Sequence, residues 1–99
     1  MIIVAGTVRI AAERLDAARP AMARVIAATR AEDGCLAYAY AQDLLDPGLI
    51  HVAERWRDRD ALRAHFAAAH MVEWRAAQPG LGLFDKSLRI YETDEGEPI

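Results

Sequence analysis

The chain has 99 residues, of which 54% are of hydrophobic types, and this length allows one domain with a small core. Its net charge is only −3 at pH 7 and its arginines alternate with acidic residues, which argues against a nucleic-acid partner. One cysteine excludes an intrachain disulfide, and no apolar run approaches the roughly 20 residues of a membrane span, so we expect a cytoplasmic protein with no membrane partner.

The first third of the chain predicts a strand followed by a long helix. Residues 2–10 alternate as a strand does, with Ile2, Val4, Val8 and Ile10 on one face and Ile3, Ala5, Thr7 and Arg9 on the other. From about residue 12 to residue 31, apolar positions recur at helical spacing. Pro20 either kinks this helix or marks the start of its regular part. Gly34 then ends it.

The middle of the chain predicts two strands joined by a turn. Residues 35–42 place Leu36, Tyr38 and Tyr40 on one face and small residues on the other. Residues 43–48 are a turn by residue type. Residues 49–56 form the next strand, with Ile50, Val52, Glu54 and Trp56 on one side.

The last part of the chain predicts two short helices and a final strand. Asp58 is a candidate N-cap for a helix whose inner stripe carries Leu62 and Phe66. A second helical piece runs from about residue 70 to residue 77, where the sequence Gln-Pro-Gly is expected to stop it. Residues 83–92 form the last strand. We therefore expect one domain over residues 1–92 and an acidic tail over residues 93–99.

The order of the elements predicts an α+β fold of the ferredoxin-like βαββαβ type. In this fold a four-stranded antiparallel sheet carries its helices on one face. The other face would be lined by small or apolar side chains such as Ala5, Ala39 and Ala53, which are poorly suited to water across a whole sheet. We expect a second copy of the chain to cover this face, and the protein to be a homodimer.

Several short motifs along nearly the whole chain resemble the antibiotic biosynthesis monooxygenase domain family. The matched positions are Glu32, Gly34, Cys35, Leu36, Tyr38, Asp43, Pro47, Glu54, Trp56, Leu62, His65, His70 and Met71. The resemblance implies a dimeric α+β barrel with a ligand cavity between helices and sheet. It also implies a cofactor-independent monooxygenase, without flavin or metal, that oxidises a quinol, phenol or anthrone-like polycyclic aromatic substrate with O2.

Two other functions remain open within the same family. One is a non-catalytic, small-ligand-binding or stress-related dimeric barrel protein, and the other is an isomerase of a small signalling molecule. Haem oxygenation is disfavoured, because the haem-degrading relatives use an asparagine in the first strand and this chain has none. Thr7 stands at about that position and lacks the amide donor.

The two histidines of the helical region are the candidate catalytic residues. His65, which the resemblance places on the helix over the cavity, is the preferred proton acceptor because imidazole titrates near neutral pH. The alternative is a histidine that is hydrogen-bonded for structural reasons. His70 is the second candidate, with helix capping as its alternative. The two lie about 140° apart on one continuous helix, so we expect no shared metal site.

The candidate substrate-binding residues are mostly aromatic. A phenol hydroxyl from Tyr40 or the cation of Arg9 is expected to stabilise a developing oxyanion. Trp56 is either a wall of the cavity or plain core with its indole N–H satisfied, and Glu54 is expected to be structural. The full set of expected substrate-binding residues is Trp56, Tyr40, Arg9, Thr7, Tyr38, Trp74 and Phe84.

Overall fold

The computed structural model describes all 99 residues and contains four strands, three α-helices and one 3-10 turn. In chain order these are β1 (Ile2–Ile10), η1 (Ala12–Arg14), α1 (Leu15–Arg30), β2 (Cys35–Gln42), β3 (Leu49–Trp56), α2 (Arg59–Ala67), α3 (Ala69–Leu81) and β4 (Leu83–Glu92). All four strands were predicted from the sequence with these bounds. Residues 93–99 form neither helix nor strand and are exposed.

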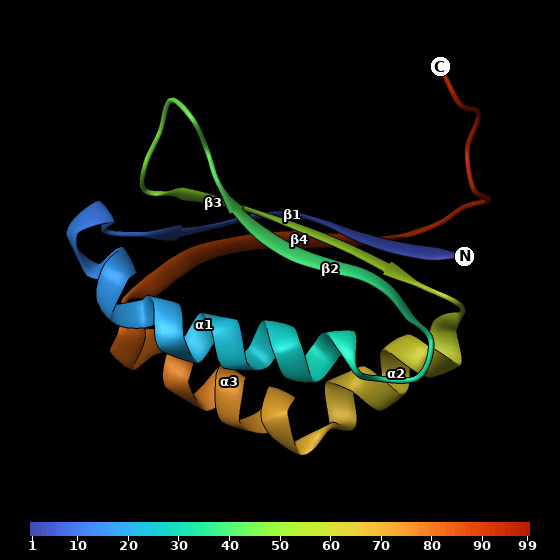
Figure 1. The fold of residues 1–99 in the computed structure, drawn as a ribbon, viewed down its shortest axis with the longest axis horizontal. Coiled ribbons are helices and arrows are strands. Elements are labelled where there is room, and N and C mark those ends of the chain that lie inside the picture. The colour runs from blue at the N-terminus through green and yellow to red at the C-terminus, as the bar shows by residue number, and fades with distance from the viewer.

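The strands form one antiparallel sheet in the order β2-β3-β1-β4. All the helices cover the same face of this sheet, and its other face carries none (Figure 1). This arrangement confirms the predicted α+β, ferredoxin-like fold with a four-stranded antiparallel sheet. None of the helices has the length and apolar composition needed to cross a membrane.

The core lies between the sheet and the helices. Strand alternation sends the even-numbered residues of β1 and β3 towards the helices, so the burial of β3 alternates residue by residue. Helix α1 lays one stripe on this face, formed by Leu15, Ala18, Met22, Val25 and Thr29. Trp56 and Tyr38 are the largest fully buried side chains. The buried face therefore contains several aromatic rings, and the site is built among them.

The structure corrects two predicted details of the helices and excludes one of the two alternatives for Pro20. Pro20 lies within α1, and the regular helix already begins at Leu15. Helix α3 runs through Pro79 and ends only where Gly82 adopts a left-handed φ of 86°, because that residue turns the chain into β4. Phe66 is 44% exposed. The inner stripe of α2 is instead formed by Ala61, Leu62 and His65.

Helices α2 and α3 are separate, as predicted, because the chain breaks between them. The Asp58 carboxylate accepts a hydrogen bond from the backbone N–H of Ala61 at 2.8 Å and caps α2. Ala68 has an extended backbone with ψ of 144°, which ends α2 and redirects the chain into α3. This break determines where His70 points.

Candidate functional site

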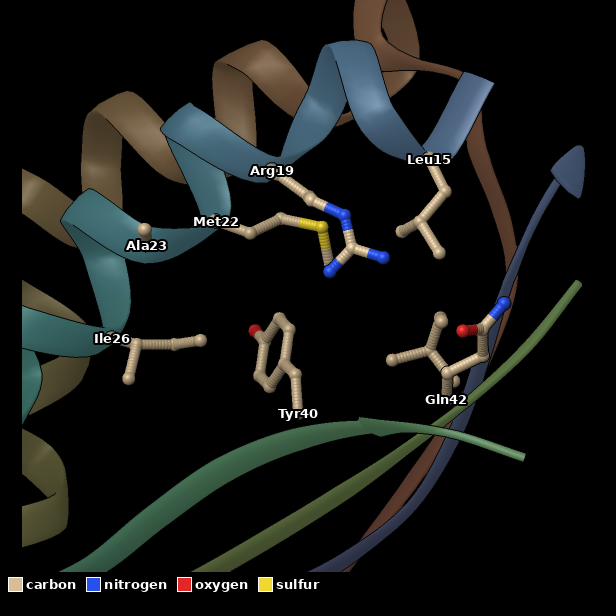
Figure 2. Close-up of a pocket in the computed structure, with 8 residues that line it drawn as sticks. Leu15, Arg19, Met22, Ala23, Ile26, Tyr40 and Gln42 are labelled. Carbon is tan, nitrogen blue, oxygen red and sulfur yellow. The ribbon is translucent and has the colours of Figure 1, made fainter. Parts of the chain in front are cut away.

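An apolar pocket of about 260 Å³ opens between α1 and the helix-covered face of the sheet. Figure 2 shows Tyr40 rising from β2 towards the helix and the Arg19 guanidinium reaching from α1 into the same space. The pocket is lined by Leu15, Arg19, Met22, Ala23, Ile26, Tyr40, Gln42 and Ile50. A pocket that is mostly apolar and has a few polar groups is the usual form of a small-molecule site.

The local sequence explains how the pocket forms. Leu15, Met22 and Ile26 recur at helical spacing, so one side of α1 faces the sheet. Arg19 falls within the same stripe, which brings its long side chain over the pocket. Tyr40 and Gln42 are two residues apart on β2 and therefore share the inner face of the sheet.

The Tyr40 hydroxyl is held in place by two buried neighbours. The Trp74 indole N–H donates to it at 3.1 Å, and the Tyr38 hydroxyl lies 3.1 Å from it. Burial raises the pKa of Tyr40, although its hydrogen bonds with Tyr38 and Trp74 oppose this effect, so the phenol is protonated at neutral pH. When Tyr38 donates its own proton to Tyr40, the Tyr40 O–H is free to donate into the pocket.

A second polar cluster joins Glu32, just beyond the end of α1, to the junction of α2 and α3. His65 Nδ1 lies 2.6 Å from Glu32 Oε2, and His70 Nε2 lies 3.4 Å from the same oxygen. The first contact is a hydrogen bond, whereas the second lacks hydrogen-bonding geometry, and His70 Nε2 is buried without a partner. The atoms of these three residues that can bind a metal all lie within 4.8 Å of one another.

His65 is packed among aromatic rings. Its ring centroid lies 4.6 Å from that of Trp56 and 5.6 Å from that of Tyr38, and the residue is only 1% exposed. Burial lowers the pKa of His65, while the hydrogen bond and charge of Glu32 act in the opposite direction. The imidazole is therefore mainly neutral at pH 7.

Glu54 and Trp56 form a hydrogen bond with each other within the core. The Trp56 indole N–H donates to Glu54 Oε1 at 2.9 Å, and both side chains are buried. Burial raises the pKa of Glu54, although the hydrogen bond from Trp56 opposes the rise. This hydrogen bond gives both residues a structural role, and neither needs a role at the pocket.

The aromatic and histidine candidates fall into two neighbouring groups. Tyr40 lines the pocket, and Tyr38 and Trp74 stand behind it and position its hydroxyl. His65 and Trp56 are packed deeper in the core and are not among the residues that line this pocket. The histidine expected to act as a base therefore does not meet the cavity beside Tyr40.

Three expected substrate-binding residues, Thr7, Arg9 and Phe84, lie on the opposite face of the sheet, which corrects their placement around the same ligand. Thr7 and Arg9 are odd-numbered residues of β1, and Phe84 pairs with Arg9, so all three point away from the helices. Arg9 instead donates to Asp46 at 2.9 Å.

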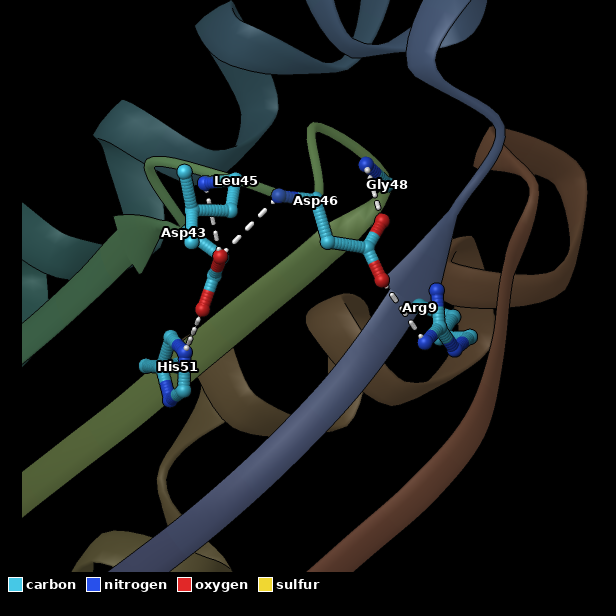
Figure 3. A network of polar contacts seen from close by, with 6 residues as sticks. All are labelled: Arg9, Asp43, Leu45, Asp46, Gly48 and His51. Carbon is cyan, nitrogen blue, oxygen red and sulfur yellow. Dashed lines mark hydrogen bonds and ion pairs between the residues drawn. The ribbon is translucent and has the colours of Figure 1, made fainter.

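Figure 3 shows that this arginine belongs to a network in the β2–β3 turn. The Asp43 carboxylate accepts hydrogen bonds from the backbone N–H groups of Leu45 and Asp46 and lies 2.8 Å from His51 Nε2. Asp46 in turn accepts from the backbone N–H of Gly48 at 3.3 Å. These contacts stabilise the turn and link it to β1.

Arg19 and Gln42, which supply polar groups to the pocket, were not predicted from the sequence. Their signal was present in the spacing, because Arg19 interrupts the apolar stripe of α1 and Gln42 follows Tyr40 on the same face of β2. Glu32 was noted only as part of a motif. Its contact with His65 joins residues 33 positions apart along the chain, which spacing alone does not reveal.

The sheet order and the helix-covered pocket define a ferredoxin-like α+β domain with a small-molecule cavity. Residues 1–77 match the family model described as antibiotic biosynthesis monooxygenase, and the chain belongs to this family. This match confirms the family that the sequence motifs indicate, and membership of that family supports a monooxygenase-like function.

Known proteins resemble the chain along its whole length. A solved structure from Deinococcus radiodurans, named as a candidate antibiotic biosynthesis monooxygenase, is 32% identical with a TM-score of 0.92, covering 100% of this chain and 98% of that one. Rv0793 from Mycobacterium tuberculosis is 26% identical with a TM-score of 0.82, covering 98% of both chains. The Synechocystis protein sll1783 is 26% identical over 98 residues, which are 99% of this chain and 67% of that protein.

Proposed function

We propose that the protein is a cofactor-independent monooxygenase that oxidises a quinol, phenol or anthrone-like aromatic substrate with O2 in the pocket beside Tyr40. The observation that carries this proposal is the meeting of an apolar cavity with a protonated, doubly hydrogen-bonded phenol in a fold of this family. At about 260 Å³ the pocket lies just below the range of about 300–1,000 Å³ that is usual for drug-sized ligands, which favours a small aromatic molecule.

The reaction needs no electrons other than those of its substrate. An anthrone-like substrate loses a proton, and the resulting anion passes one electron to O2. The radical pair combines into a C–O–O⁻ group, which takes up a proton. The O–O bond then breaks as the remaining C–H proton leaves, giving a ketone and water. The CH2 group loses four electrons and O2 gains four, so atoms and charges balance.

The pocket side chains stabilise the charges that form during these reaction steps. Tyr40, with Trp74 and Tyr38 holding its oxygen, donates a hydrogen bond to the anionic oxygen of the substrate. The positive charge of Arg19 favours the deprotonated substrate and so lowers the pKa of the bound phenol, while its ion pair with Asp16 at 3.0 Å weakens this effect. The apolar walls limit access of water to the reactive anion.

The proposed proton acceptor differs from the one expected from the sequence. His65 is hydrogen-bonded to Glu32 and separated from the cavity by its packing, so we assign it a positioning role behind Tyr38. His70 likewise contacts Glu32. We assign the substrate proton to solvent at the mouth of the pocket, where Arg19 is 61% exposed.

We also propose that the protein works as a cytoplasmic homodimer in which the helix-free face of the sheet is covered by a second copy. Ala39, Ala53 and Ala5 form a row across β2, β3 and β1 on this face, which lets another sheet approach closely. Phe84 and Tyr91 on β4 are 51% and 49% exposed in the single chain. These are apolar groups that a partner subunit would bury.

The alternative is a binding protein that uses the same pocket without turnover. The specific observation in its favour is that no histidine or carboxylate is among the residues that line the pocket. Under this alternative the wild-type protein binds quinols or anthrones but consumes no oxygen.

Oxygen uptake by the purified, metal-stripped protein with a panel of quinols and anthrones tests the proposal. We expect uptake above autoxidation for wild type and for the control Val72→Ala, which shortens an exposed side chain on α3 that does not line the pocket. Tyr40→Phe should lose activity about 10²-fold or more, as expected for the loss of an oxyanion donor. Uptake equal to that of heat-denatured protein across the panel would refute turnover and favour the binding alternative.

His65→Ala in the same assay separates the two roles of this histidine. A positioning role predicts that the variant loses stability and raises the KM, with kcat changing less. A base role predicts a large loss of kcat in protein that remains folded.

A further inference from the structure

The cluster of Glu32, His65 and His70 lies outside the proposed reaction site. None of the three residues is among those that line the pocket beside Tyr40. Glu32 follows the end of α1, His65 is in the last turn of α2, and His70 is in the first turn of α3. One carboxylate and two imidazoles are a ligand set that zinc and related divalent ions bind.

The break between α2 and α3 brings the two imidazoles together. On one continuous helix their spacing would have pointed them apart, but the extended backbone of Ala68 redirects the chain before His70. The ring centroids of His65 and His70 are 6.1 Å apart, and Glu32 Oε2 lies 2.6 Å from His65 Nδ1 and 3.4 Å from His70 Nε2.

The distances between the ligating atoms are close to those of a metal site. Ligands at the usual zinc distances are about 3.3 Å apart in a tetrahedral arrangement. Glu32 Oε2 and His70 Nε2 are separated by 3.4 Å, and all three ligating atoms lie within 4.8 Å of one another. The 2.6 Å hydrogen bond between Glu32 and His65 must open by about 0.7 Å to admit the ion, which requires a rotation of the largely buried glutamate side chain.

A second observation is the unsatisfied state of His70. Its Nε2 atom is buried and has no hydrogen-bond partner, although it faces the Glu32 carboxylate. A buried polar atom without a partner is uncommon, and an ion bound there would satisfy it.

The cluster also lies near the surface. His70 lines a pocket of about 220 Å³ between α1 and α3, together with Glu73. Glu32 lines another of about 270 Å³. Two of the three ligand residues therefore border surface pockets, but His70 Nε2 is itself buried, so entry of an ion requires these side chains to move.

We propose that Glu32, His65 and His70 form a binding site for a divalent cation of the zinc type. The ligands are Glu32 Oε2, His65 Nδ1 and His70 Nε2, with each imidazole neutral and carrying its proton on the other nitrogen. The ion ties the end of α1 to the junction of α2 and α3, and it takes no part in the chemistry beside Tyr40. This inference does not depend on the proposed function.

Calorimetric titration of the metal-stripped protein with Zn²⁺ alone tests the site. We expect one ion per chain, a raised Tm, and a Kd at least about ten-fold weaker in His70→Gln and in Glu32→Gln. His51→Gln is the matched control, because His51 pairs with Asp43 on the other face of the sheet and could bind an ion only adventitiously. Circular dichroism verifies that each variant is folded.

The visible spectrum with Co²⁺ gives an independent readout on the wild-type chain. A tetrahedral site gives an intense absorption band, which should disappear when Zn²⁺ is added. The proposal is overturned by absence of Zn²⁺ binding, by binding that His70→Gln and Glu32→Gln leave unchanged, by binding that His51→Gln abolishes, or by a Co²⁺ spectrum no different from that of the free ion.

Discussion

Replacing Tyr40 with phenylalanine removes one oxygen atom that two buried groups depend on. The Trp74 indole N–H loses its acceptor at 3.1 Å, and the Tyr38 hydroxyl loses its partner at the same distance. Trp74 and Tyr38 are only 3% and 2% exposed, so water replaces the lost contacts poorly. An unsatisfied buried polar group costs about 1–3 kcal/mol, and with partial relaxation we expect Tyr40→Phe to lower the free energy of unfolding by about 2–4 kcal/mol.

Urea unfolding of Tyr40→Phe, Trp74→Phe and the double variant, at one fixed protein concentration, measures this coupling. The double variant removes the orphaned indole donor, so the sum of the single losses should exceed its loss by about 1–2 kcal/mol. Val72→Ala, which shortens an exposed side chain on α3, should stay within about 0.5 kcal/mol of wild type. Strictly additive losses, or a Tyr40→Phe variant as stable as wild type, would refute the hydrogen-bonded arrangement described here.

Three further predictions concern stability. Burial raises the pKa of Glu54, so the folded state binds its proton more tightly than the unfolded state does. Urea unfolding should therefore show that Glu54→Gln gains stability relative to wild type as the pH rises above the usual carboxyl pKa of 4.5. Below that pH the difference in stability should stay constant. Gly6→Ala should lower the free energy of unfolding by about 3 kcal/mol, measured by heat or urea, because the added Cβ would lie 1.9 Å from the carbonyl oxygen of Ser87. Gly80→Ala in α3 is the control, because its Cβ meets nothing within 4 Å and should not destabilise the protein. Asp58→Ala should cost about 1 kcal/mol in the same assay through loss of the α2 cap, and no change would mean that another group caps this helix.

The strands could be predicted from the sequence because their signal is local. Residues 49–56 alternate between buried and exposed side chains in the structure, as their apolar pattern indicates. The order of elements then restricted the topology to the ferredoxin-like sheet that is observed. The acidic cap at Asp58 was also readable, because capping depends only on neighbouring residues.

Helix ends and helix phase were less predictable, because tertiary packing decides them. Pro79 was expected to stop α3, yet the last turn tolerates it and the helix continues to Gly82. Whether Phe66 or His65 lies on the inner stripe of α2 depends on a rotation of the helix by one residue position. The polar contact with Glu32, far away in the sequence, accompanies the burial of His65.

The site was only partly predictable for the same reason. Tyr40, Tyr38 and Trp74 were identified as aromatic candidates, but the hydrogen bond that Trp74 donates to Tyr40 joins α3 to β2 and cannot be predicted from local spacing. The expectation against a metal site assumed a continuous helix, and the backbone of Ala68 removes that assumption. Thr7 and Arg9 were grouped with residues of the other face although strand alternation already separates them. Phe84 lies on their face because a register shift interrupts the pairing of β1 with β4, which residue spacing alone does not reveal.

Isotopic labelling with ¹⁸O2 tests the central claim most directly, namely that the pocket beside Tyr40 carries out cofactor-independent oxygenation. Metal-stripped wild-type protein and an anthrone substrate should give product that carries one labelled oxygen atom, with the second label in water. Ala23→Trp, which places a large ring at the wall of the pocket, should give no more labelled product than autoxidation. Product oxygen derived from water, or labelling unchanged by Ala23→Trp, would contradict the account.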